Sequence, residues 1–288
     1  MVYTARRARR LVTMRSKPIT HSTRVLLALP LIVAASTTPA WSDPWIPAAR
    51  HGTAKSMVRL FSGNSSFPSS GFSSTAVPST KQSSTQLRLD GTAGLGQGLA
   101  LDYDLRWGHI QTSGKGSSAT SSGLQDEEIG LGYGLIQRPG FADALTLNLV
   151  VPAGQTKPGP AQGTGRWALE PDFEVGLHDQ RFSASLLAGT RIFMDGNATQ
   201  LRTELNLSAR ATQCLTITGS VFFADTPQSV HTLPPGAAGE IYNVLRLGAG
   251  VEYRLTNRFR PYFIYEANVA GRGIHAGNRL TFGIAVKY

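Results

Sequence analysis

The feature that most constrains this chain is a period-two alternation of apolar and polar residues that recurs along most of its length. In the stretch LALDYDLRWGHI (99–110), apolar side chains occupy one parity and mostly charged side chains occupy the other. Successive side chains of a β-strand point to opposite faces, so this stretch predicts a strand with one apolar and one charged face. The apolar face could pack in a soluble core, or it could meet lipid while the charged face lines a lumen.

The length of the alternating segments helps to decide between these environments. Most run for about 9–13 residues, which exceeds the five or six residues usual in soluble strands and suits tilted membrane strands. Eleven segments are clear and a twelfth, 54–61, is weaker. The clear ones are 86–95, 99–110, 127–136, 144–151, 167–178, 181–193, 200–211, 215–223, 243–254, 259–267 and 279–288.

The connections between these segments alternate in length. Short links are expected near 96–98, 138–142, 179–180, 212–214 and 255–258, and longer polar links near 62–84, 112–126, 153–166, 194–199, 226–240 and 268–278. Short turns at one end and long loops at the other are typical of bacterial outer-membrane barrels. The sequence therefore predicts an all-β, antiparallel, up-and-down transmembrane β-barrel of about twelve strands (10–14), with both termini on the short-turn side.

The first forty residues have the character of a secretory signal peptide. A basic region precedes the apolar run 25–35, and small residues before Trp41 suit cleavage after Ala40. Met14 is an alternative start that gives the signal a more ordinary length. The competing interpretation, a membrane anchor, is disfavoured because the run is shorter than the ~20 residues that span a bilayer. We therefore expect a periplasmic segment at 41–53 and the barrel at 54–288.

The net charge of +10 comes mostly from this leader, which carries seven basic residues and no acidic one. Without the leader, 21 basic residues face 18 acidic ones, so the charge gives little support for nucleic-acid binding. The single cysteine, Cys214, excludes an intramolecular disulfide and makes no metal site by itself.

The barrel interpretation assigns a role to each parity of the strands. Five aromatic residues on the apolar parity are expected to face lipid or the interfacial girdles: Tyr103, Trp107, Tyr133, Phe282 and Tyr288. Ten charged residues on the other parity are expected to line the lumen: Asp102, Asp104, Arg106, Glu170, Asp172, Glu174, Arg191, Arg202, Glu204 and Arg210. Opposed charges could polarise a constriction and select solutes, or they could neutralise one another and plug a narrow barrel.

The last segment, RLTFGIAVKY (279–288), places apolar residues at every second position and ends in an aromatic residue. This pattern resembles the C-terminal signal of outer-membrane barrels. The resemblance implies that the barrel-assembly machinery recognises this strand and that the protein resides in the outer membrane of a Gram-negative bacterium.

A second stretch, VPAGQTKPGPAQGTGRWALEPDFEVGL (151–177), resembles an outer-membrane transporter family linked to the meta-pathway of phenol degradation. The family pattern is a Pro-Thr-Gly after a strand, a polar loop, and then an aromatic residue and a proline that open the next strand. Ala153 replaces the usual threonine, whereas the other positions match: Pro152, Gly154, Trp167 and Pro171. The resemblance covers about the C-terminal two-thirds of the chain. It implies a transport role, a solute of hydrophobic or aromatic character, and no catalytic residues.

Function is therefore predicted as an outer-membrane channel or transporter for a small solute, without enzymatic activity, cofactor or metal. Glu170, Asp172 and Glu174 do not suggest a site for one small ion, because neighbours on one strand face lie ~7 Å apart. Two alternatives stay open. A barrel enzyme acting on lipid or envelope substrates would use His109 with a loop serine such as Ser113. A structural or adhesive barrel would show neither conductance nor turnover.

Overall fold

The computed structural model of the chain describes residues 44–114, 116–157, 159–195, 199–227 and 242–288. The expected signal peptide, 1–40, lies outside these ranges. Within them, no helix is long and apolar enough to cross a membrane.

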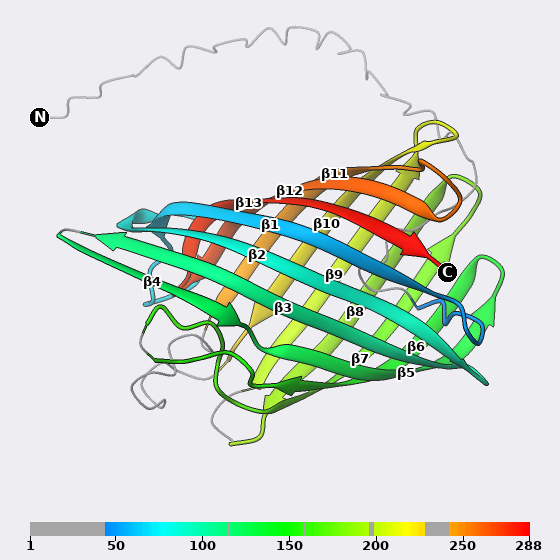
Figure 1. Cartoon of the computed structure of the whole chain (residues 1–288), viewed down its shortest axis with the longest axis horizontal. Helices are drawn as coiled ribbons and strands as arrows, with labels where there is room; N and C mark the ends of the chain where they lie inside the picture. The colour runs from blue at the N-terminus through cyan, green and yellow to red at the C-terminus, as the bar shows by residue number, and fades with distance from the viewer. Residues whose placement is uncertain (1–43, 115, 158, 196–198, 228–241) are drawn as a thin grey trace, which may run out of the picture. The chain divides into compact units, whose positions relative to one another are not determined.

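The described residues form thirteen antiparallel β-strands, shown in Figure 1. In chain order they are β1 (Gly52–Ser66), β2 (Val77–Gly96), β3 (Leu99–Gly114), β4 (Ser117–Leu124), β5 (Glu127–Arg138), β6 (Phe141–Val151), β7 (Ala168–His178), β8 (Phe182–Phe193), β9 (Thr199–Arg210), β10 (Leu215–Asp225), β11 (Asn243–Tyr253), β12 (Phe259–Arg272) and β13 (His275–Lys287).

The sheet closes on itself because the first strand pairs with the last. The β1–β13 ladder runs from Thr53 opposite Lys287 to Ser66 opposite His275. At its end, the backbone amides of Gly52 and Tyr288 donate to each other's carbonyl oxygens at 3.0 and 3.1 Å. Every other neighbour in the ring is also a neighbour in sequence, apart from the β3–β5 pair. Closure satisfies the ladder hydrogen bonds that an open edge would leave bare in lipid.

Thirteen strands fill twelve positions because β4 and β5 share one. Leu99 to Asp104 of β3 pair with β5, whereas Trp107 to Gly114 pair with β4. Residues 125 and 126 interrupt the shared strand. The predicted fold class, a twelve-stranded up-and-down barrel, is confirmed.

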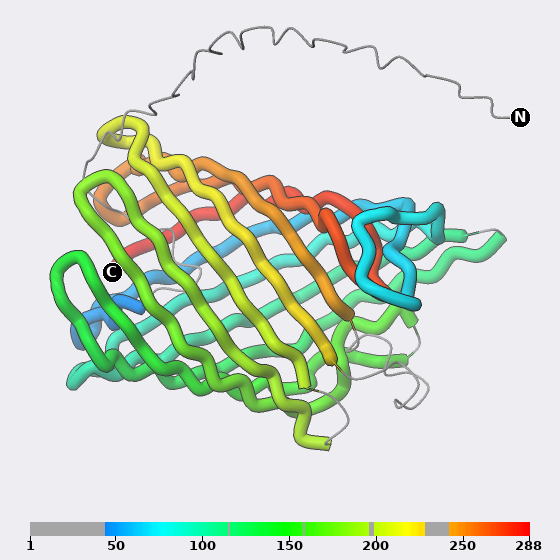
Figure 2. Tube along the Cα trace, turned by 180° about the vertical axis from the view of Figure 1, so that it is seen from behind, coloured from blue at the N-terminus to red at the C-terminus, as the bar shows by residue number. Residues whose placement is uncertain are grey.

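For three of the expected long links, the prediction of a long loop is wrong. Strand pairing extends through most of 62–84 and 112–126, and 268–278 contracts to a two-residue turn at Gly273. Positive φ (71°) at this glycine permits the tight turn. Most residues of these extensions are polar or small on both faces, so the alternation stops although the ladder continues. The strands range in length from 20 residues in β2 to 8 in β4. Figure 2 shows the barrel from behind.

The five predicted short turns are all present and all lie at one end of the barrel. They span 97–98, 139–140, 179–181, 211–214 and 254–258. The carboxy terminus and the described amino-terminal residues lie at this end too, beside the right-hand rim in Figure 1. We call it the short-turn end and the opposite one the long-loop end.

Pro171 shows how the ladder tolerates a residue without an amide hydrogen. On one side it pairs with Leu147 of β6. On the other side, the β7–β8 ladder is interrupted between Leu169 and Asp172. The missing donor thus coincides with a break in the ladder, as expected for proline in a sheet. The neighbouring Glu170 contacts β8 through an ion pair with Arg191 instead.

Candidate functional site: the charged lumen

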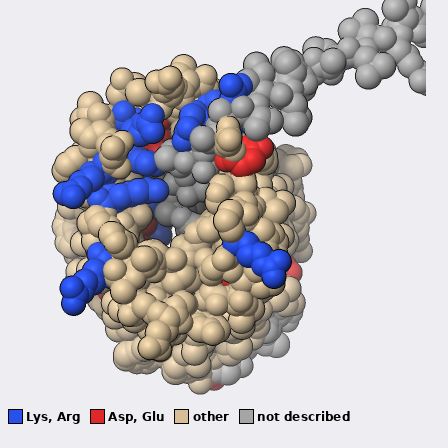
Figure 3. Space-filling view, turned by 90° about the vertical axis from the view of Figure 1, so that its right-hand side faces the viewer, with Lys and Arg blue, Asp and Glu red and all other residues tan. Residues whose placement is uncertain are grey.

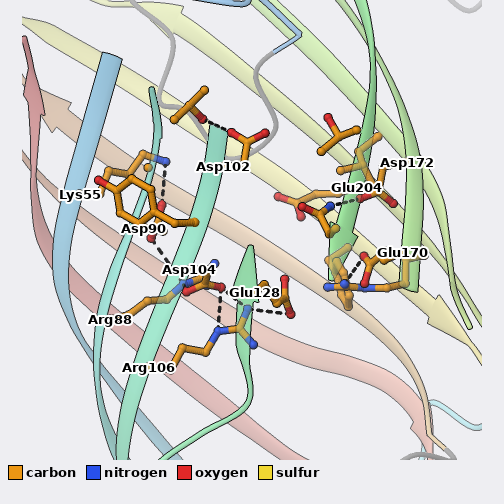
Figure 4. A pocket seen from close by; sticks show the side chains of 18 of the residues that line it. Lys55, Arg88, Asp90, Asp102, Asp104, Arg106, Glu128, Glu170, Asp172 and Glu204 are labelled. Carbon is orange, nitrogen blue, oxygen red and sulfur yellow. Dashed lines mark hydrogen bonds and ion pairs between the residues drawn. The ribbon is translucent and has the colours of Figure 1, made fainter. Parts of the chain in front are cut away.

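The barrel encloses a cavity of about 380 Å³ whose lining comes from the inward parity of nearly every strand. Its wall is dominated by charged and amide side chains, several of which are labelled in Figure 4. Many are buried from bulk solvent, including Lys55, Glu170 and Glu266, each 3% exposed. Buried charges require partners, because desolvation otherwise costs several kcal/mol per ion.

Those partners form a continuous chain of alternating charges around half of the wall, which we call the ion-pair belt. It begins on β1, where Lys55 lies 3.6 Å from Asp90. Arg88 bridges Asp90 and Asp104, at 3.4 and 2.7 Å. Its members are Lys55, Asp90, Arg88, Asp104, Arg106, Glu128, Arg191, Glu170 and Arg202. Figure 4 shows its first part.

The second half of the belt passes through shared ions. Arg106 pairs with both Asp104 and Glu128, the latter at 3.0 Å. Glu128 also accepts from Arg191 at 2.6 Å. Each charge thereby has at least one oppositely charged partner, on its own strand or on another strand of the ring, which offsets the cost of its burial.

Beyond Arg202 the contacts change character. The guanidinium groups of Arg202 and Arg246 lie over the ring of Phe222, at 5.5 and 5.0 Å from its centroid. These distances suit cation–π contacts. Arg246 and Arg279 each lie 3.7 Å from a different oxygen of Glu266. On β1, Arg59 donates to the hydroxyl of Thr281 on β13 at 3.4 Å, so side-chain contacts continue to the strand on which the belt begins.

Charge is distributed unevenly across the lumen. On β7 and β9, Asp172 and Glu204 are held by the amide groups of Asn148 and Asn206, at 2.8 and 3.1 Å, and neither has an ion-pair partner among the described residues. In the ring of twelve, β13 with Arg279 lies six strand positions from β7 and four from β9. Asp172 therefore faces Arg279 across the lumen, and opposed charges of this kind polarise a constriction.

Glycines make room for the large inward side chains. A Cβ at Gly189 would collide with the carboxylate of Asp172, and a Cβ at Gly130 would collide with the amide of Asn148. These positions cannot carry a side chain unless their neighbours move. Gly130 thus relieves crowding on the concave face of the barrel wall.

An amino-terminal segment, 44–49, narrows the short-turn mouth. Gln137 holds it from both sides: the amide of Ile46 donates to its Oε1 at 3.1 Å, and its Nε2 donates to the carbonyl of Pro44 at 2.7 Å. Pro44 is fully buried, and Trp45 packs edge-on against His178 with ring centroids 4.8 Å apart. Ile46 reaches the cavity wall.

At the other end, the connection between β6 and β7 folds back onto the β4–β5 interruption. Asp126 accepts from both the backbone amide and the hydroxyl of Thr164, each at 2.7 Å. Gln162, 5% exposed, contacts Gln125 and Ser121 at 3.1 and 2.7 Å. The lumen is therefore narrowed near both ends by hydrogen-bonded segments, the apolar segment 44–49 at the short-turn end and the polar connection between β6 and β7 at the long-loop end.

Eight of the ten residues predicted to line the lumen border the cavity: Asp102, Asp104, Arg106, Glu170, Asp172, Glu174, Arg202 and Glu204. Arg191 belongs to the belt through Glu128 and Glu170. Arg210 lies apart from them, at the short-turn end of β9, where its amide donates to the carbonyl of Arg181. Whether these residues contact a solute stays a prediction.

Several lining residues escaped the sequence-based assignment. Lys55 and Arg59 lie in the weak segment 54–61, where only their common parity with Met57 indicated an inward face. Phe222 is followed by another phenylalanine, so the apolar pattern does not distinguish the two. The structure turns Phe222 inward and leaves Phe223 38% exposed.

The five predicted girdle residues lie on the outward parity. Trp107, Tyr133, Phe282 and Tyr288 are 40%, 50%, 48% and 48% exposed, and Tyr103 is half-buried over Gly91. They belong to a wall of exposed apolar side chains on every strand position. Such a surface is unfavourable in water and suits lipid, as expected for a barrel that resides in the outer membrane.

His109 lies 2.6 Å from the hydroxyl of Ser122 across the β3–β4 pair, rather than beside Ser113. The pair shares the outward parity of Trp107, away from the cavity. Its other ladder neighbour is Thr85. A serine hydrolase also needs a group that orients the histidine and an oxyanion hole, and no described contact supplies a carboxylate to His109.

Solved structures similar to this chain are outer-membrane barrels. An outer membrane channel from Pseudomonas putida F1 matches with a TM-score of 0.69 at 14% identity, covering 88% of this chain and 100% of that one. The NanC porin matches with a TM-score of 0.53 at 9% identity, covering 82% and 100%. At these identities the likeness concerns the fold.

No curated protein sequence matches the chain. A family model does, over residues 62–283, which is most of the barrel. It agrees with the resemblance seen in the stretch 151–177. The chain belongs to the family described as "Putative MetA-pathway of phenol degradation".

Proposed function

We propose that this protein is an outer-membrane channel that passes a small solute across the membrane. The observation that carries the proposal is the polar, charged cavity inside a closed barrel whose outer wall is apolar. A barrel that served only as a scaffold could fill its interior with packed apolar side chains. Here the two buried apolar clusters contain only four and three residues.

The dimensions favour a solute of low mass. A cavity of about 380 Å³ falls at the lower end of the ~300–1,000 Å³ typical of small-molecule sites. Both mouths are narrowed, by segment 44–49 and by the connection that carries Gln162. The family description, which refers to phenol degradation, supports a solute with aromatic character.

The proposal also assigns orientation and partners. The short-turn end, with both termini, faces the periplasm, and the long-loop end faces outward. Lipid contacts the apolar wall. The closing strand β13, with its terminal Tyr288, is the segment that the barrel-assembly machinery would engage.

Heat-modifiable migration on a detergent gel tests the barrel, and solute flux into liposomes tests the channel. The folded protein should migrate differently before and after boiling, and vesicles that contain it should admit small solutes faster than empty vesicles. Boiled protein reconstituted in the same way is the control. Gel migration that boiling does not change would contradict the barrel, and absence of flux with folded protein would contradict the channel.

The channel proposal gives no catalytic role to any residue. The enzyme alternative rests on the His109–Ser122 contact. It requires that folded protein hydrolyse a lipid ester and that His109→Ala abolish this hydrolysis while flux persists. Turnover with those properties would favour the alternative.

A further inference from the structure

We infer that the lumen contains a binding site for a planar organic carboxylate, formed by Phe222 on β10, Arg246 on β11 and Arg279 on β13. The inference rests on the proposed channel function and names the class of solute. Three of the four adjacent strands β10, β11, β12 and β13 supply these side chains, and all three residues border the cavity.

The first argument is an imbalance of charge on this wall. Arg246 and Arg279 share a single carboxylate, that of Glu266, whose side chain is 4% exposed. Among the described residues, the acidic partners of Arg88, Arg106 and Arg191 in the ion-pair belt form no ion pair with Arg246 or Arg279. Two guanidinium groups that share one carboxylate leave positive charge facing the cavity, which an anion would neutralise.

The second argument is spare hydrogen-bonding capacity. The contacts of Arg246 and Arg279 with Glu266 are 3.7 Å, longer than the ~2.7–2.9 Å of a charge-assisted hydrogen bond. Among the described residues Arg279 has no hydrogen-bond acceptor, although a guanidinium group carries five N–H donors. Its side chain is 20% exposed, towards the cavity. A planar carboxylate is the ligand that such a fork binds in bidentate fashion.

The third argument is the aromatic ring beside these donors. Phe222 faces the cavity, and the guanidinium of Arg246 lies 5.0 Å from its centroid. An anion held by Arg246 and Arg279 would therefore place its organic part near the ring. A flat apolar body gains from stacking there, whereas a small inorganic anion does not.

The surroundings support entry and exit of an anion. Basic side chains gather around the short-turn mouth in Figure 3. The strand ends and turns at this rim contribute Arg50, Arg138, Arg181, Arg210, Arg254, Arg258 and Lys287. Asp172 on β7, six strand positions from β13 in the ring, repels an anion and favours its position beside Arg279.

The test uses folded, full-length barrel in planar lipid bilayers at neutral pH, with sodium benzoate as the probe. Benzoate should interrupt the chloride current in a concentration-dependent way, at least tenfold more effectively than acetate. Uncharged phenol tests the ring alone and should be weaker than benzoate.

Two variants assign the effect to the site. Arg279→Gln removes the available guanidinium and should raise the half-blocking benzoate concentration by about tenfold, the effect of one lost charge-assisted hydrogen-bonded pair. Phe222→Leu should raise it less for benzoate and leave acetate unchanged. Arg210→Gln, an equal change of charge at the rim outside the cavity, is the matched control and should raise the half-blocking benzoate concentration much less than Arg279→Gln.

Failures of the inference and of the channel proposal are distinguishable. Current that benzoate and acetate affect equally, or an equal response in Arg279→Gln and Arg210→Gln, would overturn the site while leaving the channel intact. If the folded barrel does not conduct, the channel proposal fails. Equilibrium dialysis of benzoate against the detergent-solubilised barrel and its Arg279→Gln variant then tests the site directly, and equal retention by both proteins contradicts it.

Discussion

The two faces of the barrel wall present opposite chemistry to opposite surroundings. Along β6, Leu145 and Leu147 are 49% and 53% exposed on the outside, while Thr146 between them is 7% exposed inside. In a soluble protein the apolar face would be buried and the polar face exposed. This inversion means that the buried side chains are mostly polar and are held by ion pairs and hydrogen bonds. The apolar side chains lie on the outside, where they contact lipid.

The largest effect is expected from placing a charge on the outer face. Leu147→Arg, at the middle of β6, should lower the free energy of unfolding in lipid by ~2–4 kcal/mol, because a charge near the bilayer midplane loses its hydration. Denaturant titration in vesicles, followed by heat-modifiable migration, measures this. Leu147→Ile is the control. A loss no greater than that of the control would contradict the lipid-facing assignment.

A smaller loss of stability is expected when one carboxylate of the ion-pair belt inside the lumen is removed. Glu128→Gln removes the carboxylate that Arg106 and Arg191 share, at 3.0 and 2.6 Å. The free energy of unfolding should fall by ~1–3 kcal/mol, as for lost hydrogen bonds to charged groups. Glu204→Gln is the matched control, since Glu204 is held by the amide of Asn206. Equal losses in the two variants would mean that the belt adds no stability.

Releasing the amino-terminal segment should change conductance more than stability. Gln137→Met removes both hydrogen bonds that hold residues 44–46 and should cost ~1–2 kcal/mol of local stability. Single-channel conductance should rise because the short-turn mouth widens. Gln137→Glu, which retains the acceptor for Ile46, should show a smaller rise. Unchanged conductance in Gln137→Met would show that the segment does not limit flow.

The smallest effect concerns Asp179, in the exposed turn 179–181. Its carboxylate accepts from the amides of Arg181 and Phe182 at 2.7 and 2.8 Å, which lowers the pKa of Asp179 below its usual value. A depressed pKa means that the stabilisation is present above the unfolded-state pKa, ~3.9, and is lost as the pH falls through the folded-state value.

Asp179→Ala should therefore lower the denaturation midpoint slightly at pH 7, and the difference from the native protein should shrink in acid. Asp179→Asn retains an acceptor oxygen and serves as the control. A difference between Asp179→Ala and the native protein that does not change with pH would contradict the assigned carboxylate role.

The sequence was most informative where the chain crosses the bilayer. There each residue meets either lipid or the lumen, so the alternation in 99–110 or 144–151 predicts both the strand and its faces. Beyond the bilayer, both faces meet water and the selection for alternation ends. For that reason the sequence predicts loops at 112–126 and 268–278, although most of their backbone belongs to the ladder.

By itself the sequence determined the number of strand positions, the end that carries the short turns, and the parity of most lumen charges, because the period of two is a local property of the backbone. Only the tertiary structure decided which charges pair around the ring. Glu128 meets Arg191, 63 residues away, and Arg279 lies opposite Asp172. Those relations depend on register, closure and side-chain reach across the lumen. The same is true of Arg246 and Arg279 around Glu266, since no local pattern shows which cations share one carboxylate.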